Sequence, residues 1–100
     1  MLPRLPPKPM EQIIEEVKAR RALVTAMAAR MVERNEPLRG SDGDEWVLIA
    51  PDTLDPTRWR MTRFEGDEPC NHVGPTNPVE AIMAALDYVP IESLTPASPT

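Results

Sequence analysis

The sequence predicts an α+β fold: a long N-terminal helix, a three-stranded antiparallel sheet and a short C-terminal helix, with both helices on one face of the sheet. Three observations lead to this prediction. Apolar residues recur at helical spacing over residues 10–35, two β-prone segments follow between turn signals, and a helix-start motif stands at Asn77. The length of 100 residues is that of one domain.

The first helix is expected to run from about Met10 to Asn35. Pro9 suits the first turn, where its missing N–H costs nothing, and Arg34 suits the last turn, where the helix dipole favours cations. Only Arg21 interrupts the apolar stripe, and its aliphatic stem can cover apolar neighbours. The stripe consists of Met10, Ile13, Ile14, Val17, Val24, Ala28 and Met31.

Three strands are expected after this helix. A polar turn at residues 40–44 precedes an apolar strand at 46–50, which Pro51 ends. A second strand at 58–65 alternates in polarity, and an acidic turn connects it to a short edge strand at 70–73.

Aromatic residues are few, and three of the four lie on the predicted strands. Trp46 and Trp59 are expected to fill the interface between sheet and helices. Phe64 lies on the strand face opposite Trp59. An exposed ring beside an acidic turn would suit a protein interface, whereas a curled sheet edge would bury the ring.

The second helix is predicted by Asn77-Pro78-Val79-Glu80, which supplies an Asn cap, proline at the first helical position and glutamate at the third. Beyond Pro90 the chain is expected to fray. The predicted organisation is therefore a flexible Pro-rich N-terminus at 1–9, one α+β domain at 10–89 and a flexible tail at 90–100.

Charge is divided unevenly along the chain. Residues 1–39 carry eight Lys/Arg and five Asp/Glu, a net of +3, and residues 40–100 carry three and eleven, a net of −8, giving the total of −5. Acidic loops suit a basic partner. The predicted partner-binding residues are the eight of these eleven acids that lie between positions 42 and 68: Asp42, Asp44, Glu45, Asp52, Asp55, Glu65, Asp67 and Glu68.

No catalytic or metal site is expected. Cys70 and His72 share a strand face at i and i+2, but a zinc site needs three or four ligands and the chain has no second cysteine or histidine. We therefore predict a protein that is not an enzyme and that needs no cofactor. A single cysteine also excludes an intramolecular disulfide.

Two other functions remain open. A nucleic-acid-binding regulator would use the basic residues of the first helix and Arg58, Arg60 and Arg63, and the order of elements is that of double-stranded RNA-binding domains. However, no Lys/Arg cluster opens the second helix, and a pI near 4.8 opposes direct binding to nucleic acid. Alternatively, the apolar stripe of the first helix would let the chain self-associate as a structural module.

The segment Trp59-Arg-Met-Thr-Arg-Phe64, followed by Pro69, His72 and an Ala-rich helix, resembles small accessory proteins of phages and plasmids. A short acidic one-domain chain also resembles anti-CRISPR proteins, in particular the inhibitors of the type I-F CRISPR surveillance complex. That resemblance implies an inhibitor that blocks DNA binding by presenting carboxylates, as a DNA mimic, to basic subunits of the complex.

The expected location is the bacterial host cytoplasm. The N-terminus lacks the apolar run of a signal peptide, and the longest apolar run, Trp46–Ala50, is far shorter than the ~20 residues of a membrane helix. No membrane partner is therefore expected.

Overall fold

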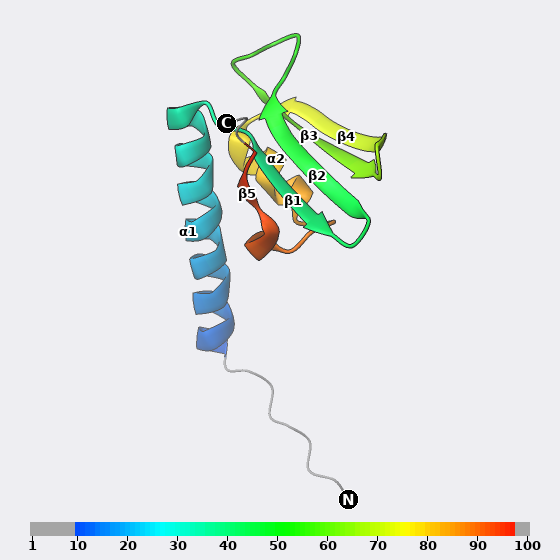
Figure 1. The fold of residues 1–100 in the computed structure, drawn as a ribbon. Coiled ribbons are helices and arrows are strands. Elements are labelled where there is room, and N and C mark those ends of the chain that lie inside the picture. The colour runs from blue at the N-terminus through cyan, green and yellow to red at the C-terminus, as the bar shows by residue number, and fades with distance from the viewer. Residues whose placement is uncertain (1–9, 98–100) are drawn as a thin grey trace, which may run out of the picture.

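A computed structural model describes residues 10–97, and the side chains from residue 12 onward. The order of elements is α1 (Met10–Arg34), β1 (Leu38–Asp42), β2 (Glu45–Pro51), β3 (Trp59–Glu65), β4 (Glu68–Thr76), α2 (Pro78–Ala85), a 3-10 turn η1 (Ile91–Ser93) and β5 (Thr95–Pro96). The fold is α+β, as predicted, with a long first helix and a short second helix (Figure 1).

The sheet has five strands rather than the three predicted. Its order is β4-β3-β2-β1-β5, and every pairing is antiparallel. The two missed strands are β1 and β5. Residues 40–44 were expected to form a turn, but Gly40 is a strand residue paired with Val47, and the turn is confined to the region of Gly43.

The neighbours of Gly40 explain why a glycine occupies this position in β1. A Cβ atom added there would lie 2.7 Å from Leu94 Cδ2 and 2.8 Å from Ser93 Oγ. The missing side chain therefore lets the C-terminal segment pack directly on β1.

The prediction that the chain frays beyond Pro90 is wrong for residues 91–97. Leu94 is buried in the core, Thr95 pairs with Arg39, and the Ala97 N–H donates to the Pro37 carbonyl at 2.8 Å. Proline in this segment suggested disorder from the sequence. It does not prevent an ordered strand here, because Pro96 lies at the sheet edge, where a missing N–H is tolerated. The segments predicted as flexible at 1–9 and 98–100 lie outside the described residues.

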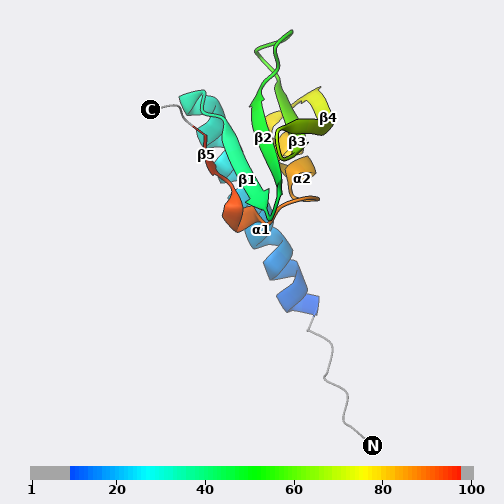
Figure 2. The same cartoon turned by 45° about the vertical axis from the view of Figure 1, so that its right-hand side comes forward.

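Both helices lie on the same side of the sheet. Figure 1 shows α2 behind the sheet and α1 beside its β1–β5 edge, and in Figure 2 the C-terminal half of α1 passes behind β1 and β5. The core lies between these layers. It consists of Val24, Ala28, Met31, Leu38, Val47, Ile49, Trp59, Met61, Ala81, Ile82, Ala85, Val89 and Leu94.

The start of α2 confirms the capping motif. The Asn77 side chain accepts a hydrogen bond from the Glu80 N–H at 2.8 Å, and Pro78 is the first helical residue. The buried residues of α2 are Ala81, Ile82 and Ala85, whereas Val79 and Met83 are exposed.

Candidate functional site

Two hairpin turns lie at the same end of the sheet, and both carry acids. β1 ends where β2 begins, at Asp42 and Glu45, and β3 ends where β4 begins, at Glu65 and Glu68. Glu45 pairs directly with Glu65 across β2 and β3. The structure thus brings six of the eight predicted acids together: Asp42, Asp44, Glu45, Glu65, Asp67 and Glu68. We call this group the acidic end.

The two turns are tied to each other. The Gly66 N–H donates to the Asp44 carbonyl at 3.2 Å, and the Trp46 indole Nε1–H donates to the Gly66 carbonyl at 2.6 Å. Gly43 and Gly66 both have positive φ, which suits tight hairpin turns. These contacts hold the acidic end as a single surface.

The six acids divide into two kinds. Glu45 and Glu65 accept hydrogen bonds from the same nitrogen of Arg63, and these bonds raise the pKa of the Arg63 guanidinium above its usual range. Arg63 also lies over the Tyr88 ring, 5.1 Å from its centroid. The remaining four, Asp42, Asp44, Asp67 and Glu68, are exposed and have no ion-pair partner among the described residues.

Asp52 and Asp55, the other two predicted acids, are not part of the acidic end. Both lie in the β2–β3 loop, at the opposite end of the sheet. Asp52 is only 2% exposed and lies 2.8 Å from Arg60, and its other oxygen accepts from the N–H groups of Leu54 and Asp55. It organises the loop and cannot reach a partner.

Asp55 acts locally within the same loop. It accepts hydrogen bonds from the Thr57 hydroxyl at 2.5 Å and from the Thr57 N–H at 3.2 Å. The hydroxyl bond is the main cause that holds the pKa of Asp55 below its usual value, because it stabilises the charged form.

An aromatic pair adjoins the acidic end on the sheet face that no described helix covers. Trp46 and Phe64 are cross-strand partners whose rings stack with centroids 4.1 Å apart and 8° between planes. The Arg39 guanidinium lies 4.3 Å from the Trp46 ring centroid. Both rings are half-buried, so one side of the pair remains accessible.

One of the two tryptophans does not lie where the sequence predicts. Trp59 is buried between sheet and helices, as predicted, but Trp46 lies on the opposite face with Phe64. The alternation of side chains along β2 could have predicted this position. Val47 and Ile49 both face the core, so the adjacent Trp46 faces away from it.

Cys70 and His72 stand on the exposed edge strand β4. His72 is paired with Thr62, whereas Cys70 falls where the register with β3 shifts, between Pro69 and Asn71. No group of three metal-ligating side chains occurs among residues 12–97. In the same part of the chain, no helix is long and apolar enough to cross a membrane.

Comparison of the chain with protein-family models, with curated protein sequences and with solved structures gives no match.

Proposed function

We propose that the protein is a non-enzymatic binding protein whose acidic end docks on a basic surface of a protein partner. One observation carries this proposal: four exposed carboxylates without ion-pair partners in the described structure lie on two turns that hydrogen bonds hold together. Like charges held in this way repel each other, and a basic partner relieves that repulsion.

The aromatic pair supports the same surface. Interfaces combine charged rims with aromatic anchors that are desolvated on binding, and Trp and Arg are common among the residues that dominate binding energy. Trp46, Phe64 and Arg39 lie on the face next to the acidic end, so a partner that covers the end also reaches this face.

We further propose that the partner belongs to a nucleic-acid-handling complex, of which the type I-F CRISPR surveillance complex in a bacterial cytoplasm is the case to test first. Lysine-rich surfaces that grip DNA are the kind of surface that a set of carboxylates fits. Inhibition would then arise from occupation of the DNA path, with no turnover.

Direct nucleic-acid binding is less well supported. Arg60 and Arg63 are three positions apart on β3, so they point to opposite faces of the sheet. Each has an acidic partner: Asp52 for Arg60, and Glu45 with Glu65 for Arg63. Cations neutralised in this way contribute little to phosphate binding.

The test compares two variants of equal net charge. The first removes the four exposed acids and leaves the partners of Arg63 in place: Asp42→Ser, Asp44→Ser, Asp67→Ser and Glu68→Gln. The control is Glu15→Lys with Glu33→Lys, two exposed positions on α1. Each variant changes the net charge by +4, from −5 to −1.

Binding of purified surveillance complex is measured for both variants at low and high salt, with DNA as a competitor. The expected result is a Kd at least about tenfold weaker for the first variant and nearly unchanged for the control, with salt weakening the wild type. Equal affinity of the folded first variant and the wild type would contradict the role of the acidic end. Failure of the wild type to bind would contradict this choice of partner.

A further inference from the structure

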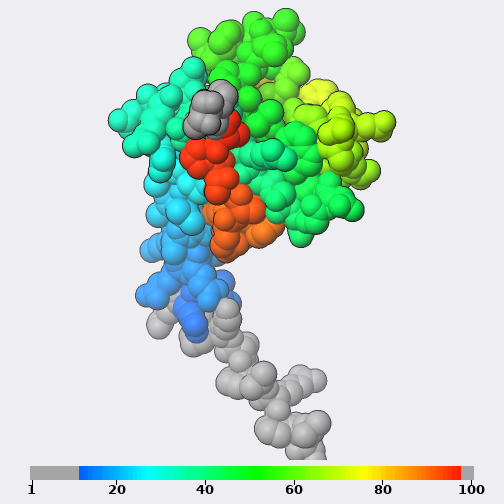
Figure 3. Space-filling view, viewed as in Figure 1, coloured from blue at the N-terminus to red at the C-terminus, as the bar shows by residue number. Residues whose placement is uncertain are grey.

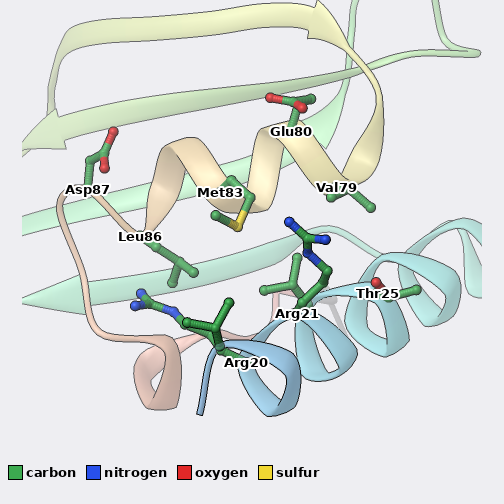
Figure 4. A pocket seen from close by; sticks show the side chains of 10 residues that line it. Arg20, Arg21, Thr25, Val79, Glu80, Met83, Leu86 and Asp87 are labelled. Carbon is green, nitrogen blue, oxygen red and sulfur yellow. The ribbon is translucent and has the colours of Figure 1, made fainter. Parts of the chain in front are cut away.

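A groove of about 780 Å³ lies between α1 and α2 (Figure 4). Apolar side chains from both helices line it, and several are exposed although they face the neighbouring helix. Figure 4 shows Met83 and Leu86 pointing from α2 toward α1, and Arg21 pointing from α1 toward α2. The apolar lining consists of Val17, Val24, Val79, Met83 and Leu86.

The two rims of this groove carry opposite charge. Arg20 and Arg21 stand on the α1 rim, and Glu80 and Asp87 stand on the α2 side. None of these four side chains has an ion-pair partner within 4 Å among the described residues. The groove therefore combines an apolar floor with one basic and one acidic rim.

The first turns of α1 extend beyond the rest of the domain. The core residues that α1 contributes, Val24, Ala28 and Met31, all lie in its second half. Ile13, 41% exposed, and Val17, 56% exposed, continue the same stripe toward the N-terminus. Figures 1 and 3 show the first turns of this helix, in blue, projecting from the body of the domain.

We propose that a second copy of this chain closes the groove, in a two-fold symmetric dimer whose α1 helices pack antiparallel. In this arrangement the first half of each α1 lies in the groove of the other copy, with Ile13 and Val17 on its apolar floor. The result is a four-helix layer made of two α1 and two α2 helices.

The opposite charges of the two rims favour a second copy of the chain as the occupant of the groove. A two-fold contact needs a patch that is complementary to itself, and here the rotation places Arg20 and Arg21 of one copy against Glu80 and Asp87 of the other. A uniformly basic or uniformly acidic partner would meet like charge on one rim. The inference uses α1 and α2 only, so it does not depend on the proposed function of the acidic end.

The first test is the mass of the full chain by sedimentation velocity over a concentration series. We expect a species of twice the 11.2 kDa chain mass that dissociates on dilution. Val17→Lys should raise the dimer Kd about tenfold or more. Val32→Lys is the matched control, because Val32 is 54% exposed on the same helix but does not line the groove, and it should leave the Kd unchanged.

A charge exchange tests the arrangement of the rims. Arg20→Glu with Arg21→Glu should weaken the dimer, Glu80→Lys with Asp87→Lys should weaken it equally, and all four changes together should restore it. Circular dichroism verifies that each variant is folded. A folded four-fold variant that stays as weak as its parents would overturn the proposal.

Two further outcomes would also overturn it. A wild-type chain that is monomeric at every concentration excludes the dimer. If such a monomer dimerises after removal of residues 1–9, the groove is occupied by the chain's own N-terminal segment instead.

Discussion

The two ends of the sheet both carry acidic residues, but the structure uses them differently. At the β2–β3 end, Asp52 is buried against Arg60 and accepts two backbone hydrogen bonds, so its carboxylate stabilises the loop. At the other end, Asp42, Asp44 and Asp67 are exposed. An acid near a turn therefore has no fixed role, and its burial and its partners decide whether it stabilises the fold or remains available for binding.

The largest effect should come from Asp52→Ala. The change leaves Arg60 without its partner and removes the acceptor of the Leu54 and Asp55 N–H groups. We expect a loss of about 2–4 kcal/mol in the free energy of unfolding, below the full cost of a broken buried pair because Arg60 is partly exposed. Urea denaturation measures it. Asp55→Ala is the control in the same loop, and an equal loss there would remove the distinction between the two aspartates.

A smaller effect is expected from Trp46→Phe, which sharpens the description of the acidic end. Phenylalanine can keep the stack on Phe64, but the hydrogen bond to the Gly66 carbonyl is lost. We expect the free energy of unfolding to fall by about 0.5–1.5 kcal/mol. Relative to the wild type, amide exchange should accelerate more at Gly66 than at residues of the β2–β3 loop. Unchanged exchange at Gly66 would mean that the indole does not hold the turn.

The variant that removes the four exposed acids should change the free energy of unfolding by less than about 1 kcal/mol. Exposed charges without ion pairs contribute little to the fold, and their removal relieves repulsion between neighbouring turns. Urea denaturation against the wild type measures this. A loss as large as that of Asp52→Ala would contradict the view that this end is reserved for binding.

The smallest effect concerns Asp55 and its hydrogen bond from Thr57. The pKa of Asp55 is lowered in the folded chain, so its contribution to stability is present above the unfolded pKa and is lost as the pH falls through the folded value. Thr57→Val should return the pKa of Asp55 toward its ordinary value, which an NMR titration of the carboxyl carbon detects. A titration that does not move would assign the shift to another cause.

Local signals were sufficient to predict the helices. The apolar stripe and the terminal charges placed α1 almost to the residue, and Asn77 with Pro78 placed the start of α2. Each of these signals depends on residues within one or two turns of each other, which is why sequence alone carries them.

The missed features depend on contacts between distant segments. β5 forms because Thr95 pairs with Arg39, 56 positions earlier in the chain. Gly40 resembles a turn residue in the sequence, but in the structure its missing side chain leaves room for Leu94. For the candidate site, the sequence alone indicates that acids flank two turns, and their role in binding stays a prediction. The burial of Asp52 and the stacking of Trp46 on Phe64 depend on strand register, which the sequence does not specify.

The edges of the sheet limit how this protein can meet other chains. One edge is β5, which has only two residues, Thr95 and Pro96, and the other is β4, which contains Pro69 and Pro75 and is irregular in register. Short edge strands and prolines deny an incoming strand a regular ladder of hydrogen bonds. Recruitment by strand addition is therefore disfavoured at both margins, and the same design protects a chain with an exposed sheet from stacking into fibres.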